Sequence, residues 1–365
     1  MSIDHLISEH VLGHDPYIPG EQPKISNGLI KLNTNENPYP PSPDILKTLS
    51  GQIEKLNLYP DSSSVELRNC IAKIHNVDPD QVIVGNGSDD ILNLCTRSFS
   101  DRTKGVGFFD PSYSLYEVLC SLNGCPTQKI PFSDSTFDID EDLITGSGTN
   151  LFFLTSPHAP TGRTYKNQLF SSILNKYDGI LVIDEAYADF ASHNALNLLE
   201  DSDRLIITRT LSKSYSLAGL RVGYGLSSKK IISILNRVRE VYNVDRIAQE
   251  IATLTLNDRK YFHQNIKKII NCRDQVLARF EEWGWNTYKS GTNFLFTRPV
   301  DKNGNIGRAV ASDLFSFLQS EHIHVRYFPQ HSLTESYLRI SIGKEKEMDM
   351  LMDKLITWQS IEPVK

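Results

Sequence analysis

Short apolar runs alternate with amphipathic segments between residues 62 and 228. The apolar runs lie at 81–87, 105–111, 150–157, 179–187 and 203–210, and the amphipathic segments lie at 62–76, 88–100 and 112–124. A continuous apolar run is typical of a strand that is buried on both faces, and the segments between the runs have the spacing of helices. Strands that alternate with helices predict an α/β domain with a largely parallel sheet.

The pattern changes on both sides of this region. Residues 13–43 are rich in Pro, Gly and Asn, a composition that favours an extended arm over a packed helix. Beyond residue 228 the chain has two long segments of helical spacing, three strand-like runs and a last helix, at 229–256, 259–284, 292–299, 323–329, 337–343 and 345–358. We therefore predict an N-terminal arm over 1–45, a large domain over 46–255 and a smaller α+β domain over 256–365.

Composition narrows the class of protein. Of the 365 residues, 39% are hydrophobic and 22% are charged, which is ordinary for a soluble globular protein. The net charge of −6 comes without a basic block and argues against nucleic acid as a partner. The five cysteines lack metal-ligand spacing, so we expect reduced thiols and no metal site. No stretch approaches the ~20 apolar residues of a membrane span and no signal peptide is visible, so we expect a soluble, cytoplasmic protein.

Polar residues follow several predicted strands, at the sheet edge where α/β proteins bind ligands. The glycine turn at 85–88 opens a helix whose free N–H groups favour an anion such as phosphate, although a plain turn is the simpler interpretation. Asp184 ends an apolar strand, so it is paired, protonated or bound to a ligand, or it caps a neighbouring loop. Tyr187, Tyr113 and the Pro-rich turn at 155–162 can each be ordinary packing features.

A single lysine, Lys213, lies directly after the apolar run at 203–210. A lysine in this position is either an ion-pair partner or a nucleophile. Arg221, Ser212 and Thr210 surround it in the sequence with a guanidinium and two hydroxyls, groups that suit a phosphate.

An aldehyde cofactor that carries a phosphate would use every one of these groups. The amine of Lys213 would form a Schiff base with the aldehyde, and Arg221 would hold the phosphate. Asp184 would protonate a ring nitrogen, and Tyr113 would stack on the ring. Pyridoxal phosphate is such a cofactor, because its electron-sink chemistry needs an acid at the pyridine nitrogen.

The motifs also form an ordered series along the chain: PYIPGEQPK, LNTNENPYP, LYPDSS, VGNGSDD, DPSYSLY, RTLSKSYSLAGLR and YLRISIG. This series resembles the fold-type I pyridoxal-phosphate aminotransferases, and within them the histidinol-phosphate aminotransferase family, over nearly the whole chain. The resemblance implies a large domain with a mostly parallel mixed sheet flanked by helices, a smaller α+β C-terminal domain and an extended N-terminal arm.

The resemblance assigns roles in cofactor binding. Lys213 would form the Schiff base and later move the proton, Asp184 would pair with the pyridinium, Tyr187 would bond to the ring oxygen and Tyr113 would stack on the ring. The residues implied at the cofactor phosphate are Gly87, Ser88, Asp89, Thr210, Ser212 and Arg221. Tyr59, in LYPDSS, would reach the phosphate of a neighbouring subunit, which implies a homodimer with shared sites.

The resemblance also assigns residues to the substrate. Arg339, in YLRISIG, would grip the acidic group of the substrate, and Arg326 would be a second anion-binding arginine, although surface salt bridges explain either residue as well. Tyr17, in the arm, would close over the substrate from the partner subunit. Asn35 is a further substrate-binding candidate in the arm.

One position departs from the family pattern. The family has Asn before the proline of the turn at 155–162, where it donates a hydrogen bond to the ring oxygen, whereas this chain has Ala159. Alanine cannot donate, so the neighbouring His158, a water or Tyr187 alone must serve that oxygen. The presence of Ala159 weakens the assignment of the substrate more than the assignment of the cofactor.

The resemblance implies a ping-pong aminotransferase of histidine biosynthesis. Glutamate would load the amino group and leave as 2-oxoglutarate, and imidazole-acetol phosphate would accept the group to give histidinol phosphate. Aromatic oxo acids are an alternative acceptor. A decarboxylase of an O-phosphorylated amino acid is a second alternative, since both reactions begin from the same complex. A cofactor-binding regulator is a third, although such a protein would carry a separate DNA-binding segment.

Overall fold

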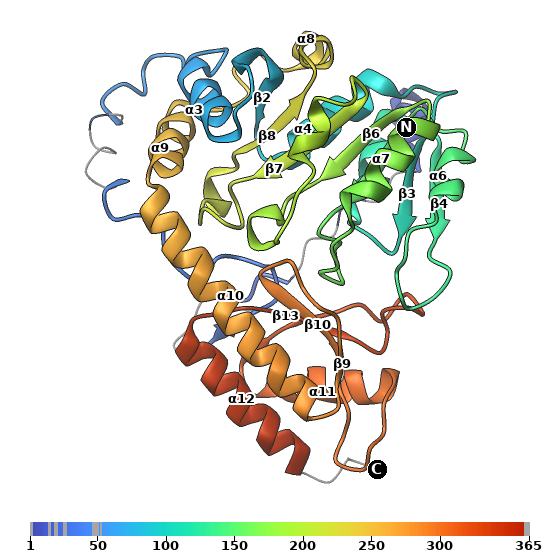
Figure 1. Ribbon diagram of the computed structural model, residues 1–365, viewed down its shortest axis with the longest axis vertical. Coiled ribbons are helices and arrows are strands. Elements are labelled where there is room, and N and C mark those ends of the chain that lie inside the picture. Colours follow the sequence, from blue (N-terminus) through green and yellow to red (C-terminus); the bar gives the residue numbers. More distant parts are fainter. Residues whose placement is uncertain are drawn as a thin grey trace.

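The computed structural model describes residues 3–13, 16–17, 21–24, 28–45, 51 and 53–360. A seven-stranded sheet and a four-stranded sheet organise this part of the chain. A long helix, α10 (Arg259–Glu282), runs from the side of the larger sheet to that of the smaller one (Figure 1). None of the helices in the described ranges is both long and apolar enough to span a bilayer.

The seven-stranded sheet has the order β2-β8-β7-β6-β5-β3-β4. Its strands are β2 (Val82–Gly85), β8 (Gly223–Ser227), β7 (Leu205–Thr210), β6 (Ile180–Asp184), β5 (Leu151–Thr155), β3 (Val106–Asp110) and β4 (Thr127–Pro131). Only β8 runs antiparallel to its neighbours, β2 and β7, and all other pairs are parallel. The predicted α/β domain with a mostly parallel mixed sheet is thereby confirmed.

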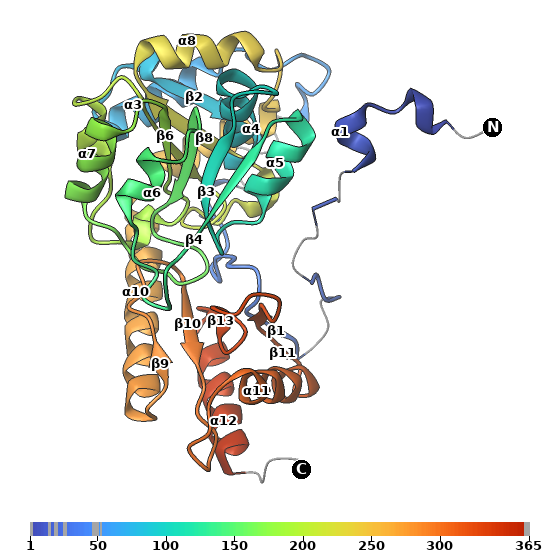
Figure 2. The same ribbon diagram turned by 90° about the vertical axis from the view of Figure 1, so that its right-hand side faces the viewer.

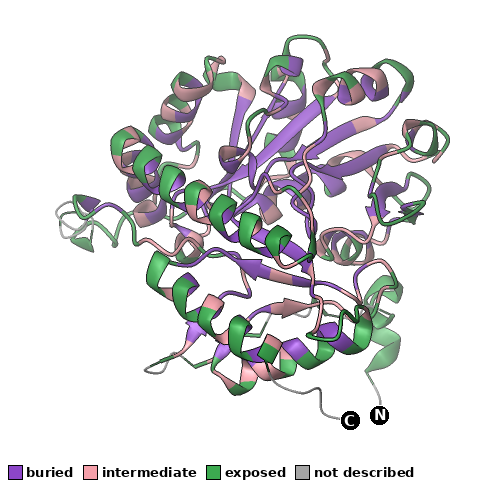
Figure 3. Ribbon diagram, turned by 60° about the horizontal axis from the view of Figure 1, so that its bottom comes forward, coloured by how far each residue is buried: buried purple, intermediate pink, exposed green. Residues whose placement is uncertain are grey.

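The central strands are buried along almost their whole length and are mostly apolar, because helices cover both faces of the sheet (Figure 3). On β6, Leu181 and Ile183 join one hydrophobic cluster and Val182 joins the other, and β7 and β5 alternate in the same way. The helices of this domain are α3 (Val65–His75), α4 (Ser88–Phe99), α5 (Leu115–Asn123), α6 (Glu141–Thr145), α7 (Asn167–Lys176), α8 (Lys229–Val238) and α9 (Arg246–Asn257). Because β5, β6 and β7 are parallel neighbours, their carboxyl ends lie together at one edge of the sheet, next to the hydrophobic core.

One sequence-based helix is wrong in detail. The segment 229–256 has helical spacing throughout, yet α8 ends at Val238 and α9 begins at Arg246. Asp245 caps α9, because its side chain accepts a hydrogen bond from the backbone N–H of Ala248 at 2.9 Å. The chain therefore turns between the two helices.

The smaller sheet has the order β12-β13-β10-β9 and is antiparallel. Its strands are β12 (Arg326–Tyr327), β13 (Leu338–Ser341), β10 (Phe294–Arg298) and β9 (Asn286–Thr287), and its helices besides α10 are α11 (Arg308–Ser320) and α12 (Glu345–Ser360). The domain boundary predicted at 255/256 falls in the last turn of α9.

The N-terminal part of the chain crosses both domains. Helix α1 (Glu9–Leu12) lies at the side of the molecule near α5 (Figure 2), where a Cβ on Gly124 would lie 3.3 Å from the ring of His10. Farther along, β1 (Ile30–Lys31) pairs in parallel with β11 (Ile323–His324) of the small domain. The segment that follows β1 then passes between the two domains and enters the site.

Candidate active site

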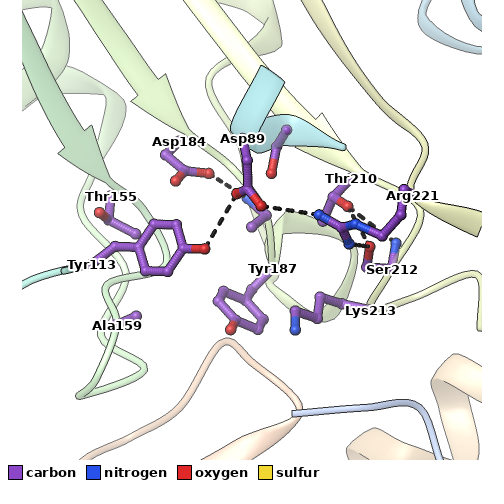
Figure 4. Close-up of a pocket in the computed structure, with 12 residues that line it drawn as sticks. Asp89, Tyr113, Thr155, Ala159, Asp184, Tyr187, Thr210, Ser212, Lys213 and Arg221 are labelled. Atoms are coloured by element: carbon purple, nitrogen blue, oxygen red, sulfur yellow. Dashed lines mark hydrogen bonds and ion pairs between the residues drawn. The ribbon is translucent and has the colours of Figure 1, made fainter. Parts of the chain in front are cut away.

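Two adjoining cavities lie beyond the carboxyl ends of β5, β6 and β7. The inner one has a volume of about 110 Å³ and the outer one of about 680 Å³. Five residues line both cavities: Tyr113, Ala159, Tyr187, Lys213 and Arg221. The inner cavity also holds Asp184, the last residue of β6 (Figure 4). The outer cavity extends to the small domain, because Arg326 and Arg339 line it.

Asp184 is a buried carboxylic acid at the floor of the inner cavity. Its Oδ2 accepts a hydrogen bond from the hydroxyl of Tyr116 at 2.8 Å, and its Oδ1 accepts from the Ala186 N–H at 3.2 Å and the Thr208 hydroxyl at 3.3 Å. Burial nevertheless raises the pKa of Asp184 to about 6. A cationic partner in the cavity, such as a protonated ring nitrogen, would favour the ionised acid.

The opposite end of the inner cavity is built for an anion. Helix α4 begins at Ser88 without a side-chain cap, so its first N–H groups remain available. Arg221 lies beside this helix end, with Nη2 at 3.0 Å from Oδ2 of Asp89 and Nη1 at 3.3 Å from Oγ of Ser212. Ser212 also accepts a hydrogen bond from Thr210 at 3.0 Å. Free N–H groups, a guanidinium and hydroxyls form a donor set that fits a phosphate.

Two glycines allow the Arg221 guanidinium and strand β8 to lie close to the start of α4. Gly87 precedes α4 with φ of 86°, and a Cβ there would lie 2.6 Å from Nη2 of Arg221. A Cβ on Gly223, the first residue of β8, would lie 2.2 Å from the backbone nitrogen of Ser88. Side chains at these positions would push the guanidinium and the helix end apart.

Lys213 and two tyrosines lie between the floor and the anion-binding end (Figure 4). Nζ of Lys213 donates to the backbone oxygen of Thr34 at 3.3 Å. The Tyr187 hydroxyl accepts from Nδ2 of Asn35 at 2.8 Å. The Tyr113 hydroxyl donates to Oδ1 of Asp89 at 3.2 Å. The amine is therefore in the same cavity as the acid and the anion-binding end.

The wall of the outer cavity on the small-domain side carries two arginines. Arg326 on β12 and Arg339 on β13 stand directly opposite each other, an arrangement that costs free energy unless an anion joins them. Nη2 of Arg339 donates to the backbone oxygen of Asn33 at 3.1 Å, and the guanidinium lies 5.3 Å from the ring of Phe328. The buried Nε of Arg339 finds no partner within the described ranges. Burial lowers the pKa of Arg339, so an anionic ligand would relieve this cost.

Comparison with known proteins identifies the family. The class I and II aminotransferase family matches residues 27–355. The chain belongs to this family. Similar curated proteins include the histidinol-phosphate aminotransferase of Microcystis aeruginosa, 41% identical over 93% of this chain and 94% of the relative, and that of Geobacter sp. strain M21, 37% identical over 96% and 97%. The aminotransferase predicted from the motifs is therefore confirmed.

Solved structures agree on the fold. The histidinol-phosphate aminotransferase of Sinorhizobium meliloti, solved with pyridoxal 5′-phosphate, superimposes with a TM-score of 0.82 at 24% identity over 91% of both chains. The L-threonine-O-3-phosphate decarboxylase of Porphyromonas gingivalis gives 0.77 at 21% identity over 91% of this chain and 100% of that one. The predicted fold-type I architecture is confirmed, and the predicted cofactor is the one with which the Sinorhizobium meliloti enzyme was solved. The fold alone does not separate the two reactions.

His158 lies outside both cavities of the aminotransferase. Its Nδ1 lies 2.8 Å from Oγ1 of Thr161, and its Nε2 lies 3.1 Å from the backbone oxygen of Pro111. Burial lowers the pKa of His158 to about 3, so the ring is neutral and both of its nitrogens are occupied. The suggestion that His158 serves the ring oxygen in place of Ala159 therefore needs correction, because the ring is fixed within the turn.

Two tyrosines lie differently with respect to the cavities of their own chain. Tyr17 lines the outer cavity of the same chain, whereas the sequence interpretation placed it over the partner's substrate. Tyr59 lines neither cavity: it is 77% exposed and stacks on Tyr242 with ring centroids 4.5 Å apart. Its predicted contact with a partner's phosphate stays a prediction.

Three features of the site were missed from the sequence. Tyr116 donates a hydrogen bond to Asp184, and its position three residues after Tyr113 was the available signal. Glu185, the residue after Asp184, pairs with Arg209 at 2.6 Å within the core, so of these two neighbouring acids only Asp184 lines the cavity. Asn37 holds the lysine loop, because its Nδ2 donates to the backbone oxygen of Lys213 at 3.0 Å, and no sequence signal pointed to that contact.

Proposed function

We propose that this aminotransferase moves an amino group between histidinol phosphate and 2-oxoglutarate, with pyridoxal phosphate in the inner cavity. The observation that carries the substrate proposal is the pair of facing arginines, Arg326 and Arg339, in a cavity that also contains Lys213. Two guanidinium groups that share one face suit the dianionic phosphate of histidinol phosphate. The names of the curated relatives support the same substrate.

The inner cavity fits the cofactor at each end. Pyridoxal phosphate supplies an aldehyde that binds amines and a ring that withdraws electrons from the carbon beside the bound nitrogen. Arg221, Ser212 and the start of α4 would hold the phosphate, and Asp184 would face the ring nitrogen. Tyr187 would donate to the ring oxygen and Tyr113 would cover one face of the ring.

Lys213 is the residue that would move the proton. Its Nζ lies between the two cavities, within reach of both the cofactor space and the substrate space. It would take the proton from the substrate carbon that bears the nitrogen and return it on the other side of the transferred group. Asp184, once ionised, would hold the ring nitrogen protonated and so stabilise the charge that develops during this transfer.

The outer cavity would accept both substrates of the ping-pong cycle. Glutamate ends in a distal carboxylate and histidinol phosphate ends in a phosphate, and the same two arginines can bind either anion. Arg339 would supply the planar fork, and Arg326 would add the second charge that a dianion requires. The cavity, at about 680 Å³, has room for the imidazole ring besides the anion.

We further propose a homodimer in the cytoplasm. Apolar side chains are exposed around Tyr59, which suits a surface covered by a second copy: Leu56, Leu58, Val241 and Tyr242. The stacked pair Tyr59 and Tyr242 would then lie in the interface, from where Tyr59 could reach the partner's cofactor phosphate. Sedimentation at micromolar concentration should show twice the chain mass, and a monomer would contradict the shared site.

A half-reaction screen tests the substrate. The cofactor-loaded protein is mixed separately with histidinol phosphate, glutamate, phenylalanine, tyrosine and phosphothreonine, and the absorbance of the bound cofactor is followed. Histidinol phosphate and glutamate should bleach it rapidly. Faster bleaching by phenylalanine or tyrosine would favour an aromatic aminotransferase, and release of carbon dioxide from phosphothreonine would favour a decarboxylase.

A further inference from the structure

Asn35 is fixed between the two domains at every polar atom. The residue is buried, and its backbone has the left-handed conformation, with φ of 56°, which asparagine tolerates better than most residues. Its backbone N–H donates to Oγ of Ser341 at 2.9 Å, and its backbone oxygen accepts from Nδ2 of Asn293 at 3.0 Å. Both partners belong to the small domain, whereas the side chain of Asn35 reaches Tyr187 of the large domain.

The hydrogen-bond network determines which end of the Asn35 amide faces Tyr187. Oγ of Ser341 accepts the N–H of Asn35 at 2.9 Å and donates its own hydrogen to Oδ1 of Asn35, also at 2.9 Å. If the amide were turned the other way, that hydrogen would have no acceptor in the part of the chain that the structure describes. The NH₂ group is therefore the end that lies 2.8 Å from the hydroxyl oxygen of Tyr187. An amide NH₂ can only donate, so Tyr187 is the acceptor in this bond.

The hydroxyl hydrogen of Tyr187 is left free by this arrangement. Within the described part of the chain, no acceptor receives it, and the tyrosine lines both cavities. A hydroxyl whose oxygen is engaged from the protein side directs its hydrogen to the opposite side, which here is the cavity.

We infer that Asn35 is a positioning residue that orients the Tyr187 hydroxyl so that it donates to the ring oxygen of the cofactor. The inference rests on the proposed cofactor pose. It gives Asn35 a role beside the substrate contact expected from the sequence: Asn35 lines the outer cavity, while one hydrogen of its NH₂ group goes to Tyr187 and its Oδ1 accepts from Ser341. It also explains how one tyrosine serves the ring oxygen beside Ala159, which has no donor.

A hydrogen bond donated to the ring oxygen stabilises its deprotonated form, so the bound cofactor should lose its proton at lower pH when Tyr187 is oriented. Other charges act on the same chromophore and must stay constant in a test. The charged groups that line the two cavities are Asp89 from α4, Asp184 from β6, Lys213 and Arg221 after β7, Arg326 from β12 and Arg339 from β13, and the outer cavity is also lined by the titratable ring of His331.

Asn35→Asp is the sharpest perturbation. The aspartate has the same shape and keeps an acceptor for Ser341, but it presents a carboxylate oxygen to Tyr187 in place of the NH₂ group. Tyr187 would then donate to residue 35 and could no longer donate to the cofactor. The pH midpoint of the cofactor's absorbance change should rise by about one unit or more, since a hydrogen bond to a charged group is worth ~1.5–3 kcal/mol.

The new negative charge raises the same midpoint, so the control is the same change in a Tyr187→Phe background. The charge effect persists there, but the hydroxyl is absent. The inference requires Asn35→Asp to shift the midpoint less in Tyr187→Phe than in wild type, by about one unit. Equal shifts in the two backgrounds would overturn it, because Asn35 would then act by charge alone.

Ser341→Ala gives a second test without any change in charge and serves if the aspartate variant fails to fold. It removes the hydroxyl that orients the amide, so the midpoint should rise by less than with Asn35→Asp, and the rise should vanish with Tyr187→Phe. If Ser341→Ala does not raise the midpoint in the protein that retains Tyr187, the inference is overturned. A wild-type protein that binds no cofactor would instead overturn the proposed function itself.

Discussion

Replacing Asp184 by Asn should make the cofactor-free protein more stable at neutral pH. The asparagine has nearly the same shape, and its Oδ1 can still accept from Ala186 and Thr208. Its NH₂ group can donate to the Tyr116 oxygen, whose hydrogen can turn to Oγ1 of Thr155 at 2.7 Å. The change therefore removes a buried charge without leaving a polar atom unpaired.

The magnitude follows from the pKa shift. Burial raises the pKa of Asp184 from 3.8 to about 6, and each unit corresponds to ~1.36 kcal/mol, so the ionised acid costs up to about 3 kcal/mol. The native state holds this proton more tightly than the unfolded state, so wild-type stability falls as the pH rises from about 4 to about 6. The cost is fully present above that range and absent below it.

Urea unfolding of both cofactor-free proteins, at equal concentration and at several pH values from about 4 to about 7.5, measures the difference. The Asp184→Asn substitution should add up to about 3 kcal/mol to the free energy of unfolding at the upper end, and the advantage should shrink toward the lower end. A difference that does not change with pH, or a less stable variant at neutral pH, would refute the reasoning. Addition of cofactor should favour the wild type, because only the carboxylate pairs with the ring nitrogen.

Three further substitutions test other parts of the site. Lys213→Ala should abolish transamination while phosphate contacts still retain cofactor, and full turnover would refute its role. Arg221→Ala should weaken cofactor binding about 10- to 100-fold in titrations of cofactor-free protein, since a charge-assisted hydrogen bond is worth ~1.5–3 kcal/mol, and unchanged affinity would count against the phosphate assignment. Arg339→Lys keeps the charge but loses the fork, so KM for histidinol phosphate should rise about 10-fold with little change in kcat, whereas a loss confined to kcat would contradict ground-state anion binding.

The central sheet could be predicted because its strands are continuous apolar runs, but two strands could not. β4 is mostly exposed, and its residues 127–131 mix polar and apolar types without a clear period. β8 at 223–227 contains two glycines and a serine, which resemble a loop until the sheet covers them. The hydrophobic pattern predicts a buried strand reliably only where both faces of the strand pack against apolar groups.

The shared cavity of the proposed cofactor residues could be predicted because most of them lie near the end of a strand or the start of a helix. Asp184 and Lys213 follow apolar runs directly, so their approach to a common edge follows from topology. The direction of a side chain does not follow from topology. His158 turns into its own loop, and Asn35 turns to Tyr187 through contacts more than 100 residues away in the sequence. Such contacts exist only once the two domains are assembled.

The covalent attachment of the cofactor to Lys213 is the central claim, and borohydride reduction followed by peptide mapping tests it most directly. Reduction fixes the cofactor to whichever amine holds it. The account predicts a single pyridoxyl adduct on the peptide that contains Lys213. An adduct on another lysine, or none after loading with pyridoxal phosphate, would contradict it.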